Sequence, residues 1–284
     1  MGNKTRHCSL RKDRKAISPA ISSVIMTSSV VVLLLVSIVF ANNFLGARMA
    51  ENEYSAIKQF MQTIGLQVDD VAWTIGRTQT MRYASKYGAV NFETVCLNYT
   101  VYLDKGNGYV YFSHNTTGVL LFNMPISKYS IANNYQHRIV PSDRSFLQTG
   151  TSAPVAHVFE MEKIPMADGN YLRVVVAPSI RMLNSTISSG GLTKNYYKFY
   201  LCALNAGLRP YYSQSVTLAG NGVAVKTESA VNKVKIHLSF PKATTGFDDS
   251  FFNFDGADKE VDVPDGSIIE VYTGKVIVSL GLYA

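Results

Sequence analysis

The sequence has few of the residues on which common catalytic and metal sites depend. It contains three cysteines and five scattered histidines in 284 residues. It has no Cys-x-x-Cys pair, no His-Glu-x-x-His motif, no Gly-x-Ser-x-Gly nucleophile turn and no glycine-rich phosphate-binding loop. These absences remove the usual signatures of zinc sites, hydrolases and nucleotide-binding enzymes. We therefore expect a protein that is not an enzyme and that uses no cofactor.

Charge is also scarce and unevenly distributed, since charged residues make up only 17% of the chain. Six lysines and arginines against one aspartate give residues 1–15 a charge of +5, which leaves +2 of the total +7 for residues 16–284. A surface that reads nucleic acid needs basic residues spread over a folded face, with aromatic residues among them. The distribution therefore argues against a nucleic-acid partner.

Only one long apolar run occurs, and it lies near the N-terminus. No charged residue stands between Ile17 and Ala41, and roughly 20 apolar residues in a helix are enough to cross a bilayer. The polar interruptions are serine and threonine, whose hydroxyls can bond to the helix backbone. Because basic residues before the run should stay in the cytoplasm, we expect a single pass through membrane lipid, with the N-terminus cytoplasmic and the C-terminal domain extracellular.

The apolar run is open to three interpretations. It could be an uncleaved anchor, or a secretory signal peptide cut after Val39-Phe40-Ala41. It could also follow a prepilin-type leader that is cut on the cytoplasmic side, before the run. The third interpretation is favoured because it alone accounts for the junction Arg14-Lys15-Ala16-Ile17-Ser18-Pro19-Ala20-Ile21.

That junction resembles the class III signal peptide of archaeal type IV pilins and archaellins, over about residues 11–45. The resemblance implies that Lys15 is the basic residue before the cut and that Ala16, where the family more often has glycine, is the last residue of the leader. Ile17 would become the new N-terminus, and Ser18-Pro19 would open the mature helix, a position at which proline is tolerated.

The resemblance also implies a function. A prepilin peptidase would process the chain, and the N-terminal helix would bind other pilin-like subunits in a type IV pilus-like surface filament. The long C-terminal part favours a minor or adhesive subunit. The alternative is a single-pass, membrane-tethered extracellular binding module that never enters a filament.

Beyond the membrane segment, apolar residues continue at helical spacing. They predict an amphipathic helical stem over residues 42–87, with a bend near Gly46 and an end at Tyr87-Gly88. The apolar stripe consists of Ile57, Phe60, Met61, Ile64, Val68, Val71, Ala72 and Ile75.

From about Glu93 the apolar period changes to two, and β-branched residues and tyrosine become frequent. Asp104–Gly108, Gly220-Asn221-Gly222 and Thr273-Gly274 have the composition of turns between short strands. We expect an α+β fold in which the long N-terminal helix packs on an antiparallel sheet or β-sandwich. The predicted parts are a basic leader (1–16), a transmembrane helix (17–41), the stem (42–87) and an extracellular β-rich head domain (88–284).

Three Asn-x-Ser/Thr sequences in the head domain are candidate N-glycosylation sites, at Asn98, Asn115 and Asn184. Asn115 stands close to Gly118 and is expected in an exposed turn, whereas Asn98 lies in the middle of a predicted strand. The sequence therefore predicts a surface glycoprotein, with Asn115 as the most accessible site.

Cys96 and Cys202 are the only cysteines outside the basic leader. In an oxidising exterior they could pair as a disulfide. The alternative is two separate buried thiols.

The acidic stretch 247–265 is a weak calcium candidate, because hard cations prefer carboxylate oxygens. Its candidate ligands are Asp248, Asp249, Asp255 and Asp258. Since the spacing fits no EF-hand loop, we expect no metal. The favoured interpretation is a solvated acidic loop whose phenylalanines pack on the core.

Overall fold

The computed structural model of the chain describes residues 14–162, 169–189, 192–207 and 214–281, without the side chains of residues 14–20, 189 and 192. Two compact units are distinguished, residues 1–49 and 50–284. The division between them falls within the predicted stem, between Met49 and Ala50. Residues 1–13 of the predicted leader lie outside the described residues.

Helix α1 (Arg14–Ala72) begins in the first unit and continues in the second. It is the one helix of the described chain that is long and apolar enough to cross a membrane, with a mean hydropathy of 2.7 in its most apolar window. The serine and threonine hydroxyls behave as expected, because Thr27 and Ser37 donate to the carbonyls of Ser23 and Leu33 at 2.9 and 2.7 Å. The helix is continuous through Gly46, and the bend expected there stays a prediction.

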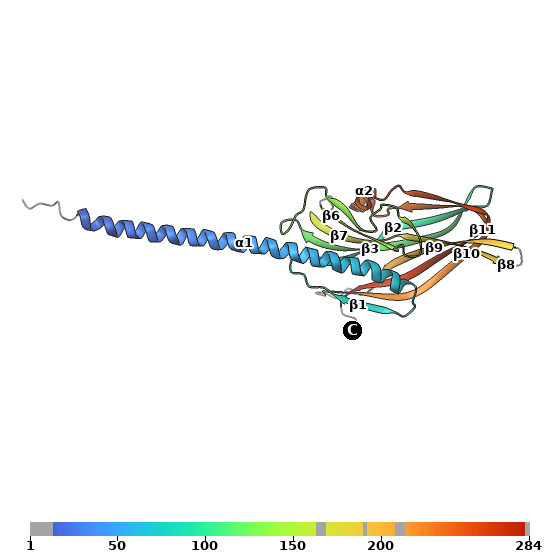
Figure 1. Ribbon diagram of the computed structural model, residues 1–284, viewed down its shortest axis with the longest axis horizontal. Coiled ribbons are helices and arrows are strands. Elements are labelled where there is room, and N and C mark those ends of the chain that lie inside the picture. Colours follow the sequence, from blue (N-terminus) through green and yellow to red (C-terminus); the bar gives the residue numbers. More distant parts are fainter. Residues whose placement is uncertain (1–13, 163–168, 190–191, 208–213, 282–284) are drawn as a thin grey trace, which may run out of the picture. The chain divides into compact units, whose positions relative to one another are not determined.

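The second unit is built around one large mixed sheet of eleven strands in the described residues, and Figure 1 shows most of them. The strand order is β4-β6-β7-β3-β2-β10-β11-β9-β8-β5, with β1 paired to β10. The strands are β1 (Thr78–Arg82), β2 (Ala89–Asp104), β3 (Tyr109–Pro125), β4 (Gln136–Val140), β5 (Leu147–Thr149), β6 (Ala156–Glu162), β7 (Tyr171–Pro178), β8 (Ile180–Ser189), β9 (Leu192–Ala206), β10 (Ser215–Ser239) and β11 (Asp258–Leu280).

The α+β prediction, with the helix on a sheet, is confirmed, but a purely antiparallel sheet is not. Strand β11 runs parallel to β9, and β5 runs parallel to β8. Alternation along a strand reveals its two faces but not its neighbours, because partners are chosen by packing between distant segments. The direction of these two pairs could therefore not be inferred from the sequence.

Each central strand contributes to two cores on opposite faces of the sheet. On β3, Leu120 and Phe122 belong to the core that includes the buried side of α1, which we call the helix-side core. Leu121, from the same strand, belongs to a second core with Phe159 and Phe199. Strand β3 also contacts β9, which is not its neighbour in the sheet, and the Leu204 N–H on β9 donates to the Thr117 hydroxyl on β3 at 2.9 Å.

The apolar stripe of the stem is confirmed between Ile57 and Ala72, where most of its residues are fully buried in the helix-side core. The helix, however, ends at Ala72 and not near Tyr87. Four residues further on, Gly76 adopts a left-handed conformation with φ of 80°, which changes the direction of the chain before the first strand. The chain then enters β1, and Ile75, the last residue of the predicted stripe, is 70% exposed.

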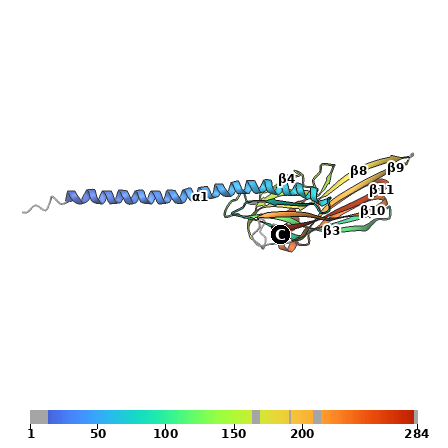
Figure 2. The ribbon, with the colours of Figure 1, turned by 90° about the horizontal axis from the view of Figure 1, so that it is seen from below.

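Two predicted turns are instead interior parts of long strands. Gly220 and Gly222 flank a bulge within β10, and Gly274 lies within β11. A Cβ atom on Gly220 would lie 2.4 Å from the carbonyl oxygen of Thr74, and one on Gly274 would lie 2.6 Å from that of Ala72. Gly220 and Gly274 therefore allow the end of α1 to approach the sheet backbone. Strands β8 to β11 extend beyond the end of α1 (Figure 2).

The second core is covered in part by the acidic segment between β10 and β11. This segment contains a short 3₁₀ turn (Ala243–Thr245) and helix α2 (Asp249–Phe252). Its four phenylalanines are buried, as predicted: Phe247, Phe251, Phe252 and Phe254.

Candidate functional site

The apolar part of α1 is the first candidate site, because its side chains are exposed on every side of the helix. Val24, Leu33 and Phe40 are 66%, 65% and 71% exposed, far more than a packed apolar side chain would be. A shallow hollow on this surface is lined by Leu35, Val36, Val39, Phe40 and Asn43. Such a segment requires either lipid or a neighbouring helix around it.

The predicted processing residues lie in the first turns of α1. The backbone of Lys15, Ala16, Ile17, Ser18 and Pro19 is helical, while their side chains lie outside the described residues. Since the helix begins at Arg14, Pro19 stands beyond the first turn, where its missing N–H leaves the carbonyl of Lys15 without its normal helical partner. Proline is better placed at the very start of a helix.

A buried carboxylate joins α1 to the sheet, and sequence reasoning missed it. Glu160 on β6 is 2% exposed. The hydroxyls of Tyr54 and Tyr135 donate to its carboxylate at 3.1 Å each, while Lys58 Nζ and His137 Nδ1 lie 3.4 Å away. Burial, with the nearby charge of Glu160, raises the pKa of Tyr54. The Tyr54 hydroxyl therefore remains a donor, and α1 is held at this point by both charge and hydrogen bonds.

A second set of polar contacts holds the end of α1. Arg181 Nη1 on β8 lies 2.7 Å from Asp69 Oδ2, and Trp73 Nε1 donates to the other oxygen of Asp69 at 2.7 Å. Tyr200 lies beneath both partners, with the Arg181 guanidinium 5.2 Å from its ring centroid and Trp73 packed edge-on at 5.2 Å. The surroundings of Trp73, the single tryptophan of the chain, therefore depend on the docking of α1, so the fluorescence of Trp73 can follow that docking.

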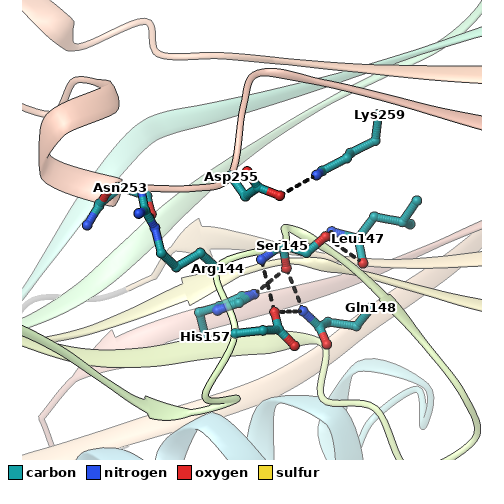
Figure 3. A network of polar contacts seen from close by, with 9 residues as sticks. Arg144, Ser145, Leu147, Gln148, His157, Asn253, Asp255 and Lys259 are labelled. Carbon is teal, nitrogen blue, oxygen red and sulfur yellow. Dashed lines mark hydrogen bonds and ion pairs between the residues drawn. The ribbon is translucent and has the colours of Figure 1, made fainter.

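A third polar network connects the loop before β5 to the acidic segment (Figure 3). Asp143 accepts from the Ser145 N–H at 2.9 Å and from Gln148 Nε2 at 2.6 Å. Arg144 Nε donates to the Asn253 carbonyl at 2.8 Å, and its guanidinium also bonds the Asn253 side chain. These contacts fix the segment that carries α2 over the second core.

His157 forms the buried part of this network. Its Nε2 lies 2.9 Å from the Ser145 carbonyl, which can only accept, so Nε2 carries the proton of the neutral ring. The ring packs edge-on against Phe254 at 5.3 Å. Burial, together with the positive charge of Arg138, lowers the pKa of His157 to about 4.

The low pKa of His157 predicts a loss of stability in acid. The unfolded chain binds this proton near pH 6.5 and the folded protein only near 4, so the contribution is complete above 6.5 and falls as the pH drops towards 4. We expect a loss of about 3 kcal/mol by pH 4. Urea unfolding at several pH values measures it. In a His157→Gln chain the free energy of unfolding should no longer fall by this amount between pH 6.5 and 4. An unchanged pH dependence in that chain would show that His157 is not the group responsible.

The candidate calcium ligands do not form a site, because three of the four carboxylates have other partners. Asp248 caps α2 by accepting from the Phe251 N–H at 3.0 Å. Asp255 pairs with Lys259 at 2.9 Å, and Asp258 with His237 at 2.9 Å. Those partners lower the pKa of Asp255 and of Asp258. The fourth, Asp249, lies within α2, and no cluster suited to a metal occurs among the described residues.

Of the two possibilities for the cysteines, the structure shows two separate thiols and no Cys96–Cys202 bridge. Cys96 and Cys202 are both free and buried. Cys96 lies in the second core, whereas Cys202 lies in the helix-side core. Burial raises the pKa of the Cys96 thiol to about 12 and also raises that of Cys202, so both thiols are protonated and unreactive at neutral pH.

The ranking of the glycosylation candidates also changes. Asn115 is not in a turn, since β3 runs without a break through Gly118, and its side chain accepts from the Thr273 hydroxyl at 3.2 Å. Asn98 is half-buried on β2 and accepts from Thr116 at 2.7 Å. Asn184 on β8 is exposed. It is therefore the best placed of the three acceptors, whose modification stays a prediction.

No family model matches the chain, and no curated protein or solved structure matches it either. The candidate sites therefore rest on the residues themselves.

Proposed function

We propose that this protein is a pilin-like subunit of an archaeal type IV pilus-like surface filament, with a minor or adhesive role and no enzymatic activity. Its partners are membrane lipid before assembly, the prepilin peptidase, and the helices of other pilin-like subunits afterwards. The observation that carries the proposal is the all-round exposure of the apolar part of α1, where large side chains such as Leu33 and Phe40 are 65% and 71% exposed. A surface of this kind suits both lipid and a bundle of neighbouring helices.

The position of Pro19 supports processing between Ala16 and Ile17. In the uncut chain the residue follows more than one helical turn, since α1 begins at Arg14. After removal of residues 1–16 it would be the third residue of the mature chain. There its missing N–H costs nothing, because the first N–H groups of a helix have no partner. The cut would therefore remove a local conflict in the helix.

Processing is tested by the intact mass of the protein isolated from cells that contain a prepilin peptidase. We expect the wild-type chain to start at Ile17. Ala16→Leu should block the cut and leave Met1 in place, because the position before the cut requires a small residue in the family that the junction resembles. Ala20→Leu, a matched change after the cut, should still yield Ile17. A wild-type chain that starts at Met1 or at Asn42 would contradict the proposal.

The tethered binding module remains the second candidate, because an anchored helix and a large extracellular domain suit it equally well. The two functions differ in where the protein is recovered. A filament subunit should appear in appendages sheared from the cell surface. Recovery in the membrane fraction alone, even after a cut at Ile17, would favour the tethered module.

A further inference from the structure

Strand β8 has one edge that is open over its outer half. On one side it pairs with β9 over its whole length, whereas on the other side β5 covers only Ile180–Met182. In the part of the chain that the structure describes, no strand pairs with that edge from residue 183 onward. All side chains from residue 184 to 188 are exposed, and Figure 2 shows the hairpin of β8 and β9 extending outwards.

Two hydrogen bonds identify the backbone groups that point to this edge. The Ile180 N–H and the Met182 carbonyl both bond to the segment that contains β5, at 2.9 and 3.2 Å. Backbone groups of successive residues in a strand point alternately to its two sides, and β8 pairs with β9 without a bulge. The N–H and carbonyl groups of the even-numbered residues in 184–188 therefore point to the open edge.

This edge lacks the features that usually prevent strands of different molecules from pairing. Proteins protect open edges with charged residues, proline, bulges or very short strands. Strand β1 carries Arg82, and β4 carries Arg138 and is followed by Pro141. The part of β8 from residue 183 to 189 contains neither a charged residue nor proline. An edge of this kind can accept another strand.

The open half of β8 is held in an extended form by side-chain contacts with β9. The Thr186 hydroxyl donates to Asn195 Oδ1 at 2.9 Å, and the hydroxyls of Ser188 and Thr193 lie 3.1 Å apart. The strand is thus ordered before any partner arrives, which reduces the entropy that pairing would cost.

The edge is complementary to itself. Two antiparallel copies related by a twofold axis through Ile187 would place Thr186 of each copy opposite Ser188 of the other. Both residues have outward-pointing N–H and carbonyl groups, so each of these pairs would form two hydrogen bonds. Ile187, which is 55% exposed, would face its own copy in a non-hydrogen-bonded pair, the arrangement in which cross-strand side chains lie closest.

We propose that two copies of this chain pair through the open edges of β8, antiparallel and centred on Ile187, into one continuous sheet. Two short edges bury little surface, so the association is weak in solution and becomes stronger where a membrane or filament holds many copies close together. The proposal goes beyond assembly through α1 and does not depend on processing of the leader.

Disulfide capture of Ile187→Cys tests this pairing. The Cα atoms of a non-hydrogen-bonded pair lie about 4.5 Å apart, which suits a disulfide. The full chain is placed in phosphatidylcholine nanodiscs at one chain per disc, which separates the α1 helices of different copies. Cys8→Ser removes the thiol of the leader, and a host that attaches no N-glycans keeps Asn184 unmodified.

Ser185→Cys is the matched control, because Ser185 is exposed on the same strand and the same face as Ile187. In the proposed register the two copies of residue 185 would be about 14 Å apart, four residues along the strand. On mild oxidation with copper–phenanthroline we expect Ile187→Cys to form linked dimers at least tenfold faster than Ser185→Cys. Equal rates would indicate random collision and overturn the proposal, and faster linking of Ser185→Cys would overturn the register.

Thr186→Pro, added to the Ile187→Cys chain, tests the backbone contacts. Proline removes an N–H that points to the open edge and leaves the hydrogen bonds to β9 in place. We expect the rate of linking to fall to that of Ser185→Cys, with the midpoint of thermal unfolding unchanged. A folded Thr186→Pro chain that links as fast as Ile187→Cys alone would show that the edges do not pair.

Discussion

Replacing Glu160 by alanine should reduce the free energy of unfolding of the sheet domain by about 3 kcal/mol, as expected when buried donors lose the acceptor that they share. The substitution leaves two tyrosine hydroxyls and Lys58 Nζ without the carboxylate that they share. Buried donors without partners carry the full cost of desolvation. Urea unfolding of the full chain, followed by the fluorescence of Trp73, measures the loss.

Glu160→Gln separates the hydrogen bonds from the charge. Its amide oxygen can still accept from Tyr54, but the attraction to Lys58 is lost. Because Lys58 is 37% exposed and can turn to water, we expect a smaller loss than in Glu160→Ala. A Glu160→Ala chain within 1 kcal/mol of wild type would contradict the assigned role of this carboxylate, since a loss that small is typical of exposed ion pairs.

Substitution of Gly220 or Gly274 by alanine should each destabilise the docking of α1 by about 3 kcal/mol, at the upper end of the usual cost of overpacking. The new methyl group would lie 2.4 Å from the carbonyl oxygen of Thr74, just after α1, or 2.6 Å from that of Ala72, the last residue of α1. These backbone atoms cannot rotate away as a side chain could. We expect a midpoint of thermal unfolding lower by about 6–12 °C, with the fluorescence of Trp73 changing in the same transition.

Gly222→Ala provides the control in the same strand. A Cβ atom there would meet nothing within 4 Å, and the backbone does not require a left-handed residue. Alanine should be neutral or slightly stabilising at such a position. Equal losses in Gly222→Ala and Gly220→Ala would show that strand propensity, and not contact with the helix, explains the effect.

The long helix and its buried face could be predicted because both depend on local periodicity. The residues from Ile57 to Ala72 recur at helical spacing, and the sheet covers that face. The end of the helix could not be predicted in the same way. The stripe pointed to Ile75 and beyond, but Gly76 adopts a left-handed conformation and its N–H bonds the Gly220 carbonyl at 2.8 Å. The segment that follows the helix is therefore held by a contact with a strand more than a hundred residues away, which the apolar stripe does not reveal.

Glycine was the residue most easily misinterpreted. At Gly106 and Gly108 it forms the predicted turn, with φ of 96° and 95°. At Gly220 and Gly274 the same residue type allows two backbones to approach each other within continuous strands. The sequence around these positions looks alike, and only the neighbour in space distinguishes a turn from a close contact.

The polar sites were missed for a related reason. Glu160 and Tyr54 stand 106 residues apart, and Lys105 and Glu228 stand 123 apart. None of these residues belongs to a recognisable motif, and each is a common residue type. Their roles arise from the order of strands in the sheet, which alternation of apolar residues does not reveal.

The seating of α1 between Ala50 and Ala72 also determines how this domain resists force. Glu160 bonds Tyr54 and Lys58, and Arg181 pairs with Asp69. Gly220 and Gly274 allow the last turn of α1 to lie against the sheet backbone. A pull along the helix axis would load all these contacts at once, in shear. A pull across the axis would instead peel them apart one after another. The domain should therefore sustain tension best when it is stretched along its own helix.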